Sequence, residues 1–379
     1  MPWSGLGRSV LGSERPSSSP CPEEYALAGE VRVAFSVERR RARWHDACVR
    51  FMPLVNATPF AVFSAPVLDR AGREVVLVIV KATFEVAAPD RVALADEQLP
   101  VRVADVPRDE SNPRSSARYP SDLCTEKLGS DLVVLGDAVA RQPTTFVDVE
   151  IRARATTVPM RVTGEREYFR GILHVGVSAA VPFETMPIEY ERAYGGMLDD
   201  LSDVEHRNPA GVGFARSPAD LVGTPAPQIE HPGTPYRTAK DRHPPIGCGA
   251  LLPHWSPRRE HAGTFDDAWK ATRMPLMPRD FDVRHNNVAH PSLMFDPPLS
   301  AGDVVSILGM THDAFQLSVP SLRLVLHGRY DERTETVRPD IDTVLVEPAP
   351  GRFELTARHA FPIGRGRNVL RELRVDIDE

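Results

Sequence analysis

The sequence lacks the features that mark several large classes of protein. Its 379 residues contain no apolar run of about 18 residues, the length that a membrane-spanning helix requires. The four cysteines, at positions 21, 48, 124 and 248, form no CxxC pair of the kind found in zinc sites and redox motifs. We therefore expect isolated thiols in a reducing compartment, a cytoplasmic location and no membrane partner.

Charge and motifs exclude further classes. The chain carries 45 basic and 52 acidic residues, a net charge of −7, which does not favour a nucleic-acid partner. The nucleophile elbow GxSxG is absent, and the glycine-rich stretch at 207–214 lacks the Lys-Ser/Thr pair of a phosphate-binding loop. Cys248 lies between His243 and His254 in sequence, but its two glycine neighbours favour a tight turn over a nucleophile.

Proline is abundant, by contrast. The chain has 36 prolines, about twice average usage, and proline is unfavourable in helices and in central strands. We predict a mainly β protein: two packed antiparallel, sandwich-like halves with long ordered loops rich in Pro and Gly. Hairpins are expected around the turns at 69–72 and 348–351. The apolar run 73–86 suits a strand buried on both faces, with Lys81 extending to solvent at the sheet margin.

The predicted domain organisation follows these patterns. The first 51 residues carry eight arginines and six acidic residues without a strand pattern, so we interpret them as a disordered or misassigned extension, with the natural start at Met52. The remaining segments are 52–320, a β-rich domain made of a first β half (52–182), irregular segments (183–298) and the start of a second β half (299–320), and 321–379, strands that complete the second half.

The stretch 243–298 combines prolines and glycines with large apolar side chains, which indicates an ordered irregular segment. It contains one short helix near 265–272, for which Thr264 is the expected N-cap and Asp267 completes a variant capping box. Aromatic residues, methionine and arginine are enriched at protein interfaces, although the tryptophans could equally belong to the core. The candidate partner-binding residues are Trp255, Arg258, Trp269, Met274, Met277 and Phe281.

The same stretch holds the best enzyme-like cluster. Asp280, Asp282 and His285 are residue types that bind divalent metals. The alternative is that their side chains cap turns or pair with nearby arginines, and on that interpretation the chain needs no metal and no cofactor.

Several short motifs resemble one bacterial family. In chain order they are NATPF (56–60), DRAGREVVLVIVKATF (69–84), SDL (121–123), DLVVLGDA (131–138), PIEYERAYGG (187–196), RNPAGVGF (207–214), WSPRREHAGTFDDAW (255–269) and RMPLMPRDFD (273–282). Together they resemble the family catalogued as domain of unknown function 2169 (DUF2169). The resemblance covers about 52–320; residues 1–51 have no counterpart, and the match is weak from 330 onward.

The resemblance implies an accessory protein and not an enzyme. Members are thought to bind a cognate effector toxin of the type VI secretion system, to keep it soluble, and to help load it onto the VgrG spike. The family supplies no catalytic residues. We therefore expect a non-catalytic adaptor or chaperone; the alternatives are a metal-dependent hydrolase using the 280–285 cluster and a structural component of the secretion apparatus.

Overall fold

The computed structural model describes residues 52–88, 91–366 and 368–378, so the extension expected at 1–51 lies outside the described residues. Met52–Glu379 forms one compact unit built mainly from strands, which confirms the mainly β prediction. Within the described ranges the α-helix is α1 (Asp267–Thr272), and no helix there is long and apolar enough to cross a bilayer. Short 3-10 turns are η2 (Tyr190–Arg192), η3 (Pro218–Leu221), η4 (Arg258–His261), η5 (Val283–Asn286) and η6 (Pro291–Leu293).

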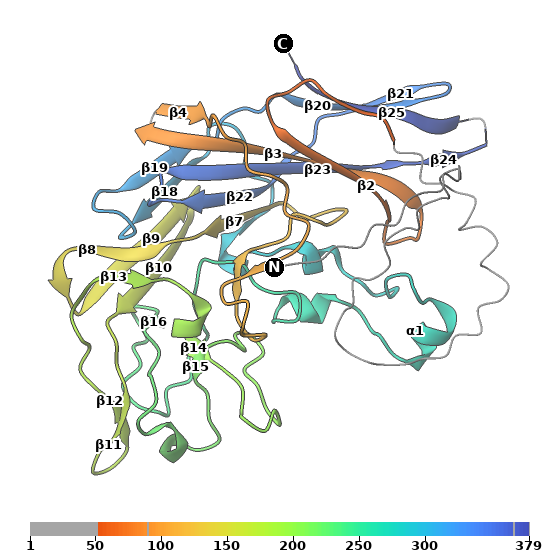
Figure 1. Ribbon diagram of the computed structural model, residues 1–379. Coiled ribbons are helices and arrows are strands. Elements are labelled where there is room, and N and C mark those ends of the chain that lie inside the picture. The colour runs from red at the N-terminus through yellow and green to blue at the C-terminus, as the bar shows by residue number, and fades with distance from the viewer. Residues whose placement is uncertain (1–51, 89–90, 367, 379) are drawn as a thin grey trace, which may run out of the picture. The chain divides into compact units, whose positions relative to one another are not determined.

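The largest described sheet draws strands from both ends of the unit (Figure 1). In spatial order its strands are β17 (Met294–Phe295), β7 (Ser130–Val134), β22 (Ile341–Glu347), β23 (Arg352–Pro362), β3 (Glu74–Ala88) and β2 (Ala61–Leu68), with β4 (Arg91–Leu94) also paired to β3. The hairpin β22–β23 lies between β7 and β3. Strands from the C-terminal part of the chain therefore complete a sheet whose other strands come from earlier in the sequence. The strands therefore do not separate into the two successive halves that their order suggested.

Two five-stranded sheets pack with the first sheet around a common core. One contains β16 (Ile229–Glu230), β10 (Thr156–Thr163), β9 (Phe146–Ala153), β18 (Val304–Leu308) and β19 (Phe315–Ser318). The other contains β1 (Leu54–Asn56), β25 (Asn368–Ile377), β20 (Leu324–Tyr330) and β21 (Thr334–Val337), with β24 (Gly364–Arg365) paired to β25. Buried side chains of all three sheets, among them Ile151, Leu326 and Phe353, form one apolar cluster.

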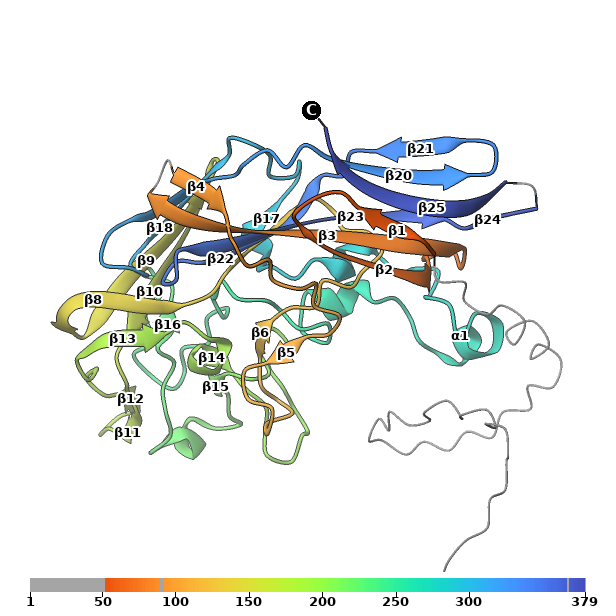
Figure 2. The same ribbon diagram turned by 45° about the horizontal axis from the view of Figure 1, so that its top comes forward.

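Short strand pairs and coils cover the rest. The pairs are β5 (Val106–Pro107) with β6 (Ala117–Tyr119), β8 (Asp137–Thr144) with β13 (Phe183–Pro187), β11 (Tyr168–Arg170) with β12 (Val175–Val177), and β14 (Tyr194–Gly195) with β15 (Val212–Gly213). The strands β7 and β8 are separated at Gly136, whose φ is 150°, and β8 then pairs with β13. In both ribbon views the coils of 188–293 lie below the β3–β23 layer, and β20 and β25 lie above it (Figures 1 and 2).

The β2–β3 hairpin shows how local sequence produces this frame. The Asp69 carboxylate accepts hydrogen bonds from the backbone N–H groups of Ala71 and Arg73, and Gly72 supplies the positive φ of 78° that the turn requires. The prediction of a hairpin here is confirmed. Residues 75–84 of β3 are buried throughout, as expected for a strand covered on both faces.

Candidate functional site

Two of the six candidate partner-binding residues lie in the interior. Trp255 has 0% of its surface exposed; its ring meets Tyr190 edge to face at 5.3 Å, and its Nε1 donates to His254 Nε2. Arg258 is also buried and donates to the backbone carbonyls of Leu251 and His285. These two side chains stabilise the irregular segment from within, and this corrects the expectation that they lie on a binding surface.

The short helix forms near the predicted position but begins differently. Its N-cap is Asp266, whose carboxylate accepts from the backbone N–H of Trp269 at 2.7 Å. Thr264 is therefore not the cap; its backbone N–H and hydroxyl donate to Asp280 instead. Phe265, which precedes this cap, packs edge to face against Trp269, with ring centroids 4.8 Å apart.

The chain after α1 is attached to the β2–β3 turn. Arg273 donates through Nε to the carbonyl of Met277 at 2.6 Å, and through Nη2 to the carbonyl of Arg70 at 3.0 Å. Leu276 packs against Gly72, where an added Cβ would lie 2.7 Å from its Cδ1. These contacts place the loop 274–281 beside the end of β2.

An apolar groove lies where this loop meets the sheet. We define the apolar groove by Leu68, Leu123, Met277 and Phe281, with Leu77 of β3 at its base. Its volume is about 220 Å³ and it is half open to solvent. Pockets that enclose small molecules usually have about 300–1,000 Å³. The groove therefore suits one or two apolar side chains of a partner better than a free ligand.

A charged pocket of about 440 Å³ adjoins the groove and shares Arg70 and Thr125 with it. Both signs of charge line it: Arg70, Arg73, Lys127 and Arg358 with Asp69, Glu126, Asp340 and Asp342. Arg70 and Glu126 form an exposed ion pair at 3.3 Å. An apolar centre beside a polar margin is the usual anatomy of a protein interface.

Buried ion pairs hold the strands behind this surface. The Lys81 side chain is fully buried, with Nζ 2.5 Å from Asp122 Oδ2 and 3.1 Å from Glu354 Oε2. Arg102 reaches both oxygens of Glu354, at 2.7 and 2.5 Å. Because Lys81 is central in β3 and covered on both sides, the expectation that it extends to solvent at the sheet margin is wrong.

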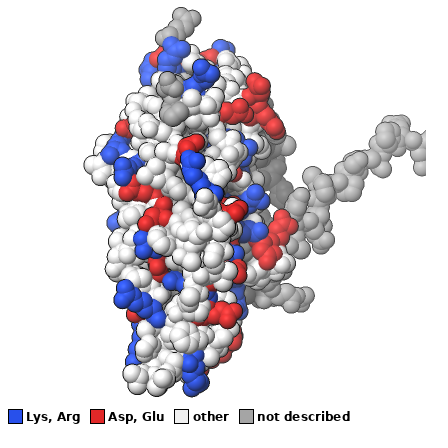
Figure 3. All heavy atoms as spheres, turned by 90° about the vertical axis from the view of Figure 1, so that its left-hand side faces the viewer, with Lys and Arg blue, Asp and Glu red and all other residues white. Residues whose placement is uncertain are grey.

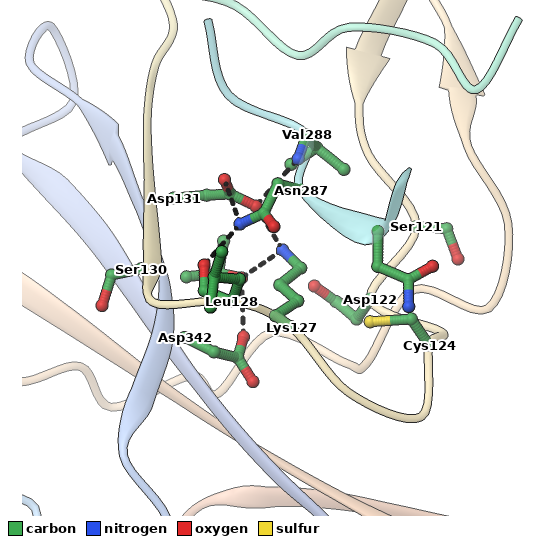
Figure 4. A network of polar contacts seen from close by, with 12 residues as sticks. Ser121, Asp122, Cys124, Lys127, Leu128, Ser130, Asp131, Asn287, Val288 and Asp342 are labelled. Carbon is green, nitrogen blue, oxygen red and sulfur yellow. Dashed lines mark hydrogen bonds and ion pairs between the residues drawn. The ribbon is translucent and has the colours of Figure 1, made fainter. Parts of the chain in front are cut away.

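A second network fixes the position of 286–288 next to the groove (Figure 4). Asp131 Oδ2 accepts from Lys127 Nζ at 2.7 Å and from the backbone N–H of Val288 at 2.8 Å. Asn287 Nδ2 donates to the Leu128 carbonyl and to Asp131 Oδ1. Segments about 160 residues apart in sequence are thus locked together, and the groove that they border is preformed.

A family model described as "Uncharacterized protein conserved in bacteria (DUF2169)" matches residues 71–358. The chain belongs to this family. No curated protein and no solved structure matches it.

In this DUF2169 protein the three side chains of the alternative metal site, Asp280, Asp282 and His285, are each engaged elsewhere. Asp280 accepts both hydrogen bonds of Thr264, and these lower its pKa. Asp282 caps η5 and pairs with Arg284, and the hydrogen bond from Arg284 lowers the pKa of Asp282 to about 2. His285 Nδ1 lies 2.9 Å from the Arg258 carbonyl. Over the described ranges no group of three or more His, Cys, Asp or Glu side chains is arranged to hold a metal ion.

The two cysteines that the structure describes are free thiols. Cys248 is buried, and desolvation raises its pKa to about 12, so the thiol is protonated at neutral pH. Cys124 contributes to the groove wall; burial raises its pKa despite the charge of Arg358. Neither environment activates a nucleophile, because activation requires a lowered pKa.

Proposed function

We propose that this DUF2169 protein is a non-catalytic adaptor that binds an effector toxin of a type VI secretion system and assists its loading onto the VgrG spike. The observation that carries the proposal is the apolar groove, in which exposed Leu68, Leu123 and Met277 surround a preformed cavity. The motif resemblance supplies the expected partner class.

The groove fits the binding step because its anchors come from three separate segments that are fixed before any partner arrives. Leu68 ends β2, Leu123 precedes the loop held by Lys127, and Met277 follows α1. A preformed site avoids the entropy cost of ordering loops on binding. Covering an apolar effector segment in this groove would stabilise the complex and suppress aggregation by mass action.

The test uses two methionines of nearly equal exposure. Met277 lines the groove and is 46% exposed, whereas Met274 is 47% exposed and lies outside it. The tagged protein and its Met277→Asp and Met274→Asp variants are each co-expressed with the products of the neighbouring genes. We expect one product to co-purify with the wild-type protein. Its affinity should fall about 30-fold or more for Met277→Asp, which is the loss typical of an interface hot spot. Its affinity for Met274→Asp should equal that for the wild type.

Two results would overturn the proposal. One is the failure of every neighbouring product to co-purify with the wild-type protein. The other is an enzymatic turnover by the purified protein alone, in the absence of any partner, that is unchanged in the Met277→Asp variant. Stoichiometric incorporation into purified sheath or spike particles would instead identify a structural component. Equal losses for both methionine variants would place the interface on the whole 274–281 loop and not in the groove.

A further inference from the structure

The β11–β12 hairpin ends in an exposed apolar tip. Its turn is closed by a hydrogen bond from the Gly171 N–H to the His174 carbonyl at 3.0 Å, so Ile172 and Leu173 are the two central turn residues. Such positions are usually taken by Gly, Asn or Asp. Ile172 is 103% exposed and Leu173 is 91% exposed, so neither side chain packs against the protein.

The base of the hairpin is rigid, which makes the tip a fixed projection. Tyr168 is buried in a small cluster with Leu221, Ala226 and Ala239. The ring of Phe169 lies over Gly176, where an added Cβ would be 3.1 Å from the ring, and half of the Phe169 surface remains exposed. In Figure 1 the hairpin lies at the lower left, beyond the sheets.

Basic side chains lie next to the tip, on the hairpin itself and on the segment that pairs with β12. The segment 237–239 pairs antiparallel with β12, through hydrogen bonds from Val177 to Arg237 and from Ala239 to Val175. Lys240 follows Ala239 directly, in the turn 238–241 that the Asp241 N–H closes on the Thr238 carbonyl. Arg170, Arg237 and Lys240 are exposed, and none of them joins an ion pair within the described ranges.

One acidic group lies beside these three basic residues and offsets part of their charge. It is Asp241, whose carboxylate accepts hydrogen bonds from the backbone N–H groups of Arg237 and Thr238. Glu165 and Glu167 lie at the end of the hairpin away from the turn. In the space-filling view the lower end of this side of the molecule is mostly uncharged, with basic side chains beside it (Figure 3).

We propose that the hairpin tip inserts Ile172 and Leu173 into the surface of an anionic phospholipid bilayer. The order of side chains matches the polarity gradient of a membrane interface: aliphatic at the apex, then an aromatic ring and cations at headgroup depth. A convex tip of three apolar residues is far smaller than a stable protein interface, which uses about 20–30 residues on each side. The contact is peripheral and needs no spanning helix.

Charge sets the orientation of this contact. The whole chain carries a net charge of −7, so an anionic surface repels most of the molecule and attracts it through the basic layer of the hairpin. Binding should therefore require both the anionic headgroups and the apex side chains, and it should weaken as salt rises. The proposal is independent of the groove and of the effector.

The experiment measures co-sedimentation of the full-length protein with vesicles of phosphatidylethanolamine and phosphatidylglycerol, and with vesicles of phosphatidylcholine alone. We expect binding to the phosphatidylglycerol vesicles at low salt, and a loss of about tenfold or more in the Ile172→Ser/Leu173→Ser double variant. The matched control is Val103→Ser/Leu201→Ser, which removes two exposed aliphatic side chains elsewhere and should bind like the wild type. All proteins keep residues 1–51 with their eight arginines, so any lipid attraction of that segment is common to them.

Insertion itself has a separate readout. In a Leu173→Trp variant, phosphatidylglycerol vesicles with brominated acyl chains should quench the added fluorescence, and wild-type emission gives the baseline. Arg170→Glu/Lys240→Glu should remove the preference for the anionic vesicles. The proposal is overturned if the wild type does not sediment with phosphatidylglycerol vesicles at low salt, or if the apex double variant sediments equally well. If the wild type binds no vesicles but captures a co-expressed protein, and this capture depends on Ile172 and Leu173, the tip binds a protein partner instead.

Discussion

Replacing Lys81 by methionine removes a buried positive charge and leaves the shape of the side chain nearly unchanged. Met fills most of the volume of the lysine stem, so apolar packing within β3 is retained. The ion pairs to Asp122 and Glu354 are lost. Glu354 still has the Arg102 guanidinium, whereas the Asp122 carboxylate keeps one hydrogen bond, from the backbone N–H of Arg102 at 2.7 Å, and the more distant charges of Arg102 and Arg358. The buried Asp122 carboxylate is therefore the group that loses its ion pair.

The expected cost is set by this stranded charge. Removing one partner of a buried ion pair destabilises a protein by about 3–5 kcal/mol, a large part of the about 5–15 kcal/mol that stabilises a typical fold. The Lys81 side chain is 0% exposed, so solvent does not screen the interaction. The urea midpoint should fall by about 1 M or more at neutral pH. The Lys81→Met/Asp122→Asn double variant should recover part of the loss, because it removes the stranded charge as well.

Urea unfolding monitored by circular dichroism tests this prediction. Lys270→Met is the matched control: it makes the same substitution at a lysine whose ion pair with Asp267 is exposed, and exposed pairs contribute little. A loss below about 1 kcal/mol for Lys81→Met, or no recovery in the double variant, would refute the reasoning that the buried charge is stabilised by its pairing.

Two further predictions concern the interior. Trp255→Ala should destabilise the protein by about 3–5 kcal/mol, because the side chain is fully buried against Tyr190; a urea midpoint equal to the wild type would contradict its role in the core. Burial raises the pKa of Glu354, but the hydrogen bond from Arg102 and the charge of Lys81 outweigh it and hold that pKa below the usual value of about 4.3. The stabilisation by Glu354 should be complete above about pH 4.3 and be lost as pH falls through its lower folded-state pKa, so urea midpoints below about pH 4 should fall less steeply in Glu354→Gln than in the wild type. If the urea midpoints of the wild type and of Glu354→Gln fall equally steeply below about pH 4, another group governs the loss of stability in acid.

Local sequence was sufficient for the elements themselves. The turn at 69–72, the β22–β23 hairpin and a short helix near 265–272 all follow from patterns that span a few residues. The motifs that resemble DUF2169 are local in the same sense, and the family match confirms membership. The exact helix start was not predictable, because Thr264 and Asp266 are both good caps and the choice depends on Asp280, which lies 16 residues from Thr264.

Only the tertiary structure decided which side chains are available to a partner. Trp255 and Met277 belong to one irregular segment with interface-like composition, yet the first is enclosed by Tyr190 and the second borders the groove. Leu68 and Leu123 gave no signal in the sequence, since an apolar residue beside a turn is equally common in a core. From the sequence, Lys81 resembles a residue at the margin of the sheet. Only the fold brings Asp122 and Glu354 to it from elsewhere in the chain. Burial and pairing depend on contacts between distant segments, and a pattern that spans a few residues carries no information about them.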